Sequence, residues 1–175
     1  MRHAMVLFIV LASSMIVFSA GLTPDPENLP NFQQPRPQIY TAGQPTETGF
    51  REVASMGVKT VINVLPEKEC LPGEDKMVNE RRMAYVMLPF ETTGFKVETV
   101  RQFSALLKNS EKPMLIHCRT GNHVGGLWYA YRVLAEKAPS ATALREARMI
   151  GLMPSLENRL VKWVAQQHGK LQTGK

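Results

Sequence analysis

The sequence predicts an α/β fold in which a mostly parallel central sheet lies between layers of helices. Two observations predict this fold. Short apolar runs that suit strands alternate along the chain with segments of helical period. The run at 58–65 is rich in β-branched residues and continuously apolar, which is typical of a strand buried on both faces. Strands that alternate with helices form parallel sheets through crossover connections, so we expect three layers.

Each element follows from its local pattern. Thr46 is a helix N-cap candidate, and Gly57 is a typical terminator for the same helix. Pro89 ends the third strand, and Pro113 precedes the fourth. The predicted strands are 38–41, 58–65, 84–88 and 114–117. The predicted helices are 46–56, 75–83, 97–107, 124–136, 140–150 and 155–167.

Composition limits the functional classes. The chain has 175 residues, 44% of them hydrophobic, which suits one globular domain with an ordinary core. The formal charge of +6 is compatible with anionic substrates. Because the basic residues form no dense stripe with interleaved aromatic residues, the sequence argues against nucleic-acid binding. No group of carboxylates and histidines has metal-ligand spacing, so we expect no metal and no cofactor.

The amino-terminal segment is typical of an export signal. Arg2 and His3 form a short basic region, and the apolar run 4–18 follows it. The small residues Ser19 and Ala20 mark a cleavage region, so 1–20 is predicted to be a signal peptide. The alternative is an uncleaved anchor, because the segment 4–22 is just long enough for a short span. We therefore expect an exported, periplasmic or secreted protein, with membrane contact only if this segment is retained.

The rest of the chain divides into three parts. The segment 21–37 is rich in Pro, Asn and Gln and has little periodicity, so it is expected to be a linker or extended arm. The folded domain is predicted at 38–168, followed by a short tail at 169–175.

One cysteine lies where chemistry is expected in such a fold. Ligands of parallel sheets bind beyond the carboxyl ends of the strands, and Cys118 follows directly after the strand 114–117. A helix N-terminus supplies the positive potential that favours a reactive thiolate, and the same N–H groups bind oxyanions. Gly121 allows a left-handed conformation in which the N–H groups of the loop converge. This arrangement favours a nucleophile in an anion cradle over a buried structural cysteine.

Four segments carry a family resemblance in the expected order. They are Tyr40-Thr41-Ala42-Gly43-Gln44-Pro45, Val61-Ile62-Asn63-Val64, Leu88-Pro89-Phe90 and His117-Cys118-Arg119-Thr120-Gly121. Together they resemble the bacterial dual-specificity-like protein tyrosine phosphatases, in particular the beta-lactamase-hydrolase-like phosphatase group. The resemblance covers 38–160. It implies a cysteine-phosphatase fold, with Cys118 attacking phosphorus to form a phosphocysteine that water hydrolyses.

The resemblance also assigns roles to neighbouring residues. The loop 119–124 corresponds to the phosphate cradle, with Arg119, Thr120, Gly121, Asn122, His123 and Val124 as its members. His117 corresponds to a histidine that orients the loop and tunes the thiol. Glu91 stands where the family has an aspartate general acid, so it is the candidate acid.

The sequence departs from the family at the arginine that grips the phosphate. In the tyrosine phosphatases this arginine lies six residues after the cysteine, where Val124 stands, and in loops of rhodanese length it lies five after, where His123 stands. Three interpretations remain open. Protonated His123 binds the phosphate with a pH-dependent grip; or the chain is a rhodanese-like sulfurtransferase that carries a Cys118 persulfide; or it binds phosphate-like ligands with little turnover.

The second cysteine is a candidate redox partner. Cys70 lies in the loop after the strand 58–65, which also emerges at the carboxyl edge of the sheet. An exported protein can form disulfides, so a Cys70–Cys118 bond would protect or switch off the site. The alternative is an unrelated free thiol. The leading prediction is thus a cysteine-dependent phosphatase acting on a phosphorylated protein or small molecule, and the sequence does not specify which.

Overall fold

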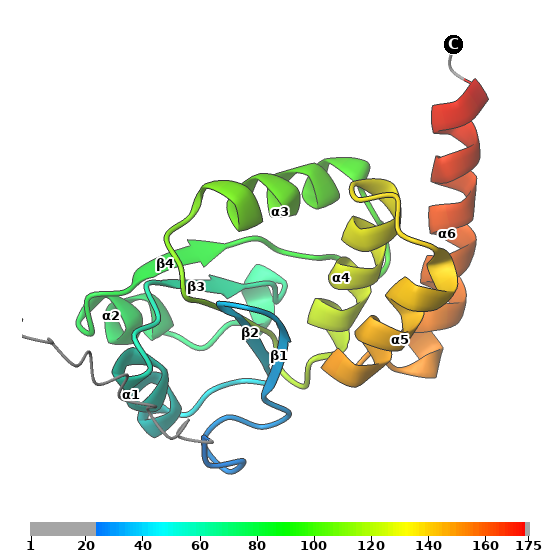
Figure 1. Ribbon diagram of the computed structural model, residues 1–175. Coiled ribbons are helices and arrows are strands. Elements are labelled where there is room, and N and C mark those ends of the chain that lie inside the picture. The colour runs from blue at the N-terminus through cyan, green and yellow to red at the C-terminus, as the bar shows by residue number, and fades with distance from the viewer. Residues whose placement is uncertain (1–23, 174–175) are drawn as a thin grey trace, which may run out of the picture.

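The computed structural model describes residues 24–173, so the predicted signal segment 1–20 lies outside the described residues. A five-stranded sheet forms the centre of the molecule (Figure 1). Its strands are β1 (Gln33–Arg36), β2 (Ile39–Ala42), β3 (Thr60–Asn63), β4 (Ala84–Met87) and β5 (Met114–His117). They lie in the order β1-β2-β5-β3-β4. All neighbours are parallel except β1 and β2, so the mostly parallel sheet is confirmed.

The described residues form six α-helices and one short 3-10 helix, η1 (Glu67–Glu69), and the last three α-helices follow the final strand. The helices are α1 (Glu47–Ser55), α2 (Glu74–Asn79), α3 (Val97–Asn109), α4 (Asn122–Leu134), α5 (Ser140–Ile150) and α6 (Pro154–Thr173). Helices α1 and α2 lie on one side of the sheet, whereas α3 and α4 lie on the other, with α5 and α6 packed against α4 (Figure 1). No helix within residues 24–173 combines the length and apolar character needed to cross a membrane.

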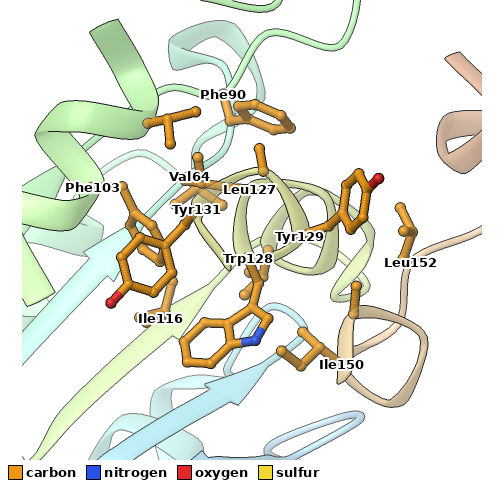
Figure 2. Close-up of a cluster of buried hydrophobic side chains, with 14 of the residues drawn as sticks. Val64, Phe90, Phe103, Ile116, Leu127, Trp128, Tyr129, Tyr131, Ile150 and Leu152 are labelled. Carbon is orange, nitrogen blue, oxygen red and sulfur yellow. The ribbon is translucent and has the colours of Figure 1, made fainter. Parts of the chain in front are cut away.

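Two apolar clusters fill the spaces between the layers. The larger one surrounds α4, which is buried on nearly all sides. Figure 2 shows its side chains around that helix, with Phe103 from α3, Ile116 from β5 and Leu152 from the segment before α6. Gly125 permits this packing, because a Cβ there would lie 2.6 Å from the carbonyl oxygen of Ala147. The smaller cluster joins α1 and α2 to the opposite face of the sheet.

The amino-terminal segment is part of the domain from the first residue that the structure describes onward. The range 21–37, expected as a linker or extended arm, contains β1, which pairs antiparallel with β2 at the edge of the sheet. Leu29 is fully buried in the smaller apolar cluster. At the other end, α6 continues to Thr173 through most of the range expected to be a tail.

Candidate active site

Cys118 lies at the carboxyl edge of the sheet, between the last residue of β5 and the first turn of α4. Strand β5 is central, with β2 and β3 on either side, so the loop that follows it emerges at the middle of this edge. The residue is 1% exposed, and the backbone N–H of Gly121 donates to its sulfur at 3.1 Å. The first N–H groups of a helix have no carbonyl partner in a preceding turn, and they face an anion bound at this end.

Gly121 is required by the shape of the loop. Its φ of 93° is in the left-handed region that favours glycine. A Cβ at this position would lie 2.3 Å from the carbonyl oxygen of Ile150 and 2.6 Å from the side-chain nitrogen of Asn31. The expected left-handed glycine is therefore confirmed, and the loop packs against the end of α5 and against Asn31.

Hydrogen bonds from three other segments hold the loop. The backbone N–H of Gln44 donates to the carbonyl oxygen of Arg119 at 3.0 Å. The side chain of Asn31 donates to the carbonyl oxygens of Thr120 at 3.4 Å and Ile150 at 2.5 Å. The side chain of Asn122 accepts a hydrogen bond of 2.9 Å from the N–H of Met153.

Arg119 is committed to a neighbouring loop. One guanidinium nitrogen donates to the carbonyl oxygen of Glu69 at 3.0 Å, and the side chain is otherwise exposed. The contact ties the β3–α2 loop to the cysteine loop. Arg119 therefore acts as a bridge between loops in this structure.

The two positions that could have carried the family's arginine have opposite environments. Val124 is fully buried in the larger apolar cluster, so its side chain cannot contact an anion, and only its N–H remains available to the cradle. The place of Val124 in the phosphate cradle therefore depends on its backbone N–H and stays a prediction. His123 is half-buried, and its Nδ1 has no hydrogen-bond partner among the described residues.

The imidazole of His123 lies among charges of both signs. Burial lowers its pKa, the carboxylates of Glu69 and Glu91 oppose that shift, and the guanidinium of Arg119 adds to it. Glu91 is exposed just after Phe90, whose N–H donates to the carbonyl oxygen of Val64 at 3.1 Å. The candidate acid therefore lies within electrostatic reach of the cysteine loop.

Behind the loop lies a buried polar network that the sequence interpretation missed. The side chain of His117 is fully buried, and its Nε2 lies 3.0 Å from Oε1 of Glu74, which is itself 1% exposed. The side chain of Asn63 donates to the same carboxylate oxygen at 2.9 Å, and that of Gln44 donates to Oε2 at 2.7 Å. Burial alone would raise the pKa of Glu74, but the contacts with His117, Gln44 and Tyr85 outweigh burial and lower it.

Cys70 borders this network. Its sulfur lies 3.5 Å from the side-chain nitrogen of Asn63, which donates to it. Burial raises the pKa of the Cys70 thiol, and the nearby carboxylates of Glu74 and Glu67 raise it further. Both cysteines are free thiols in the structure. The disulfide suggested by the sequence stays a prediction.

A cysteine between a central parallel strand and a buried helix, with the N–H of Gly121 donating to its sulfur, is the arrangement typical of cysteine-based phosphatases of the dual-specificity type. A comparison with protein families agrees. The family model described as DSP-PTPase phosphatase fused to NAD+ kinase matches residues 24–159, and the chain belongs to this family. The resemblance that the sequence motifs predicted is confirmed.

Individual relatives support the same class. The Beta-lactamase hydrolase-like protein of Xylella fastidiosa is 26% identical over 137 residues, which are 74% of this chain and 31% of that relative. The chain thus spans about a third of the length of the curated relative. A DUF442 protein of Shewanella putrefaciens CN-32, assigned as a phosphatase, is 27% identical with a TM-score of 0.62, and the match covers 81% of this chain and 95% of that one.

A more distant structure shows the shared fold. TpbA of P. aeruginosa, solved in complex with phosphotyrosine, is 20% identical with a TM-score of 0.58, and the match covers 74% of this chain and 79% of that one.

Proposed function

We propose that the protein hydrolyses a phosphate monoester through a phosphocysteine intermediate on Cys118. One observation carries the proposal: the sulfur lies below the first turn of α4 and already accepts the N–H of Gly121 at 3.1 Å. A thiolate so placed is in the positive field of the helix terminus, and a phosphoryl group above it would meet the remaining N–H groups of the loop.

In the first step, the Cys118 thiolate attacks phosphorus. The bond between phosphorus and the ester oxygen breaks with its electron pair on that oxygen, which takes a proton as it leaves. Glu91 is the proposed donor, because it projects from the neighbouring β4–α3 loop and its charge acts on His123. In the second step, water attacks phosphorus and gives a proton to the Glu91 carboxylate, the phosphorus–sulfur bond breaks, and inorganic phosphate and the thiolate result.

The proposed substrate class is an aryl phosphate. The structure of TpbA holds phosphotyrosine in a related fold. Aryl oxygens are good leaving groups, so their loss depends less on a strong general acid. This suits a site in which the candidate acid is an exposed glutamate.

Hydrolysis of an aryl phosphate by the reduced protein, beside Cys118→Ser, tests the proposal. Turnover in the parent and none in the variant supports it. Rapid acid quenching followed by peptide mass spectrometry should then find one phosphoryl group on the peptide that contains Cys118. An active Cys118→Ser variant would refute it. If the parent is inert, thiosulfate-to-cyanide transfer separates a sulfurtransferase from a binding protein.

The environment of His123 favours a second candidate function, binding of phosphate-like groups with little turnover. This side chain stands where the shorter family loop has its arginine, and burial lowers its pKa. A neutral imidazole supplies no permanent charge to a phosphoryl group in the transition state. Tight binding of a phosphate mimic by a protein that shows no turnover would support this candidate.

A further inference from the structure

The carboxylate of Glu74 contacts both flanks of the nucleophile. On one side, Oε1 meets Nε2 of His117, the residue before Cys118, at 3.0 Å. On the other, Oε2 accepts the side-chain N–H of Gln44 at 2.7 Å, and the backbone N–H of Gln44 donates to the carbonyl oxygen of Arg119, the residue after Cys118. Glu74 therefore reaches both neighbours of the sulfur-bearing residue, one directly and one through Gln44.

Each arm leads to a different element, so the carboxylate joins parts of the fold that are distant in sequence. Glu74 opens α2, His117 ends β5, and Gln44 lies in the turn between β2 and α1. A third contact, from Asn63 at the end of β3, donates to Oε1 at 2.9 Å. Residues at or just beyond the carboxyl ends of three strands thus meet at one carboxylate.

Stability alone is a weak explanation for this carboxylate. Glu74 is 1% exposed and His117 is fully buried, and a buried ionic contact often contributes no more than a well-packed apolar pair would. Fixed geometry is a better explanation, because a charge that is satisfied on both oxygens holds its partners in one arrangement. The 3.0 Å contact between Oε1 and Nε2 also holds the ring of His117 in place beside Cys118.

We infer that Glu74 is a positioning residue for Cys118: by contacting His117 and Gln44 at once, it fixes the start of the cysteine loop and keeps the thiol in its reactive arrangement. The inference rests on the proposed function, in which Cys118 is the nucleophile. Glu74 itself touches no substrate, since the carboxylate is enclosed beneath the loop.

The experiment measures how fast iodoacetamide alkylates Cys118 in the whole folded chain, with peptide mass spectrometry separating Cys118 from Cys70. Alkylation reports how reactive and accessible the thiol is, and it needs no phosphatase turnover. Glu74→Gln keeps the shape of the side chain but turns one acceptor into a donor. The new NH2 group takes the place of either Oε1, which contacts Nε2 of His117, or Oε2, which accepts the side-chain N–H of Gln44, so one of these two contacts is disturbed. Asp75→Asn is the matched control, because Asp75 is an exposed acid in the same first turn of α2.

We expect Glu74→Gln to slow alkylation of Cys118 by about tenfold or more, the equivalent of losing one hydrogen bond to a charged group. If the parent hydrolyses an aryl phosphate, kcat should fall by a similar factor while KM changes little, because the substrate contacts are untouched. Asp75→Asn should match the parent in both. A Glu74→Gln protein that is folded at the assay temperature and is alkylated at the parent rate would overturn the inference.

A second variant guards against a Glu74→Gln protein that does not fold. Gln44→Ala removes one arm and leaves the contact between Glu74 and His117, so we expect alkylation of Cys118 to slow by about threefold. An unchanged rate in a folded Gln44→Ala protein would then decide against the inference. The outcome is separable from the proposed function: slower alkylation in variants of a parent without phosphatase activity supports the role of Glu74 and counts against the phosphatase.

Discussion

An arginine introduced into the cysteine loop should strengthen anion binding at position 123 and prevent folding at position 124. At His123 the side chain is half-buried beside the cysteine loop, and its Nδ1 has no partner among the described residues. At Val124 the side chain is enclosed in the larger apolar cluster. We therefore predict that His123→Arg strengthens anion binding and that Val124→Arg unfolds the domain.

The magnitudes follow from these environments. An arginine at 123 can add one or two charge-assisted hydrogen bonds, each of about 1.5–3 kcal/mol, to a bound oxyanion. Glu69 and Glu91 act on this position and would also attract the new guanidinium, so we expect the lower end of the range. A gain of about 1.4 kcal/mol is tenfold in affinity. At 124 the change loses about 1.5 kcal/mol of burial and adds several kcal/mol for an unpaired buried charge. That sum is comparable with the whole stability of many domains.

Calorimetric titration with sulfate, together with thermal unfolding of each variant, measures both effects. His123→Lys is the matched control, because it adds the charge without the planar fork of arginine. We expect it to gain less affinity than His123→Arg. A folded Val124→Arg protein that binds sulfate more tightly than the parent, beside a His123→Arg protein without any gain, would refute the assignment of position 123 to the cradle.

The same titration tests the charge of His123 through its pH dependence. Because burial lowers the pKa of this imidazole, protonation occurs only at a more acidic pH than for an exposed histidine. Sulfate keeps its charge between about pH 5 and 8, so any change in its binding comes from the protein. Parent affinity should rise as the pH falls, and the His123→Arg protein should lose most of that rise. A parent affinity that is flat with pH would show that His123 does not contact the anion.

Four further predictions follow from single features. Gly121→Ala should lower the free energy of unfolding by about 2 kcal/mol or more, measured by urea denaturation, because of the left-handed φ and the close carbonyl of Ile150; an unchanged midpoint would contradict this. Glu91→Gln should reduce turnover of an alkyl phosphate more than that of an aryl phosphate, and equal losses would exclude it as the acid. Mild oxidation should remove the two free thiols of Cys70 and Cys118 together and reversibly, whereas equal thiol counts before and after would eliminate the disulfide. Cell fractionation and amino-terminal sequencing should find an exported protein cut near residues 19–20, and an intact amino terminus would contradict signal cleavage.

The order and type of the elements could be predicted because the hydrophobic periodicity and the glycine, proline and capping residues indicate the same boundaries along most of this chain. The strand 114–117 and the helix 140–150 have the predicted bounds. Helix α4 begins at Asn122, two residues before the predicted start, because Gly121 acts as the N-cap through its backbone alone. A cap without a side-chain acceptor leaves no mark in the sequence other than the glycine itself.

Strand β1 could not be predicted from its residues. Gln33–Arg36 is polar, contains a proline and shows no alternation, and it lies at the edge of the sheet, where only one neighbour constrains it. Its pairing with β2 depends on a tertiary contact instead. Leu29, a single buried side chain in a polar stretch, attaches the segment to the domain.

The position of Cys118 could be predicted from the sequence, but the buried contacts of Glu74 that hold its loop could not. A strand that ends at a cysteine and a glycine-containing turn before a helix are local signals. Glu74, by contrast, lies in a charged segment that looks like any solvated helix start, with Asp75 beside it. Only the fold separates the two acids, since it buries the first against His117 and leaves the second in solvent. Buried polar networks combine residues from several strands, and their spacing in the sequence carries no period.

The charge around the loop limits how the protein can hold an anion. The one arginine of the loop, Arg119, donates to the carbonyl oxygen of Glu69, and the imidazole of His123 has a lowered pKa. Near neutral pH the cradle must therefore rely on backbone N–H groups and on the field of α4, neither of which titrates. These groups align on an oxyanion only if the loop keeps its shape, and the loop keeps its shape through Gly121, Gln44 and the carboxylate below them. A cradle made of backbone groups depends on the rigidity of its loop, so substitution of the buried Glu74 should reduce the reactivity of Cys118 even though Glu74 touches no substrate.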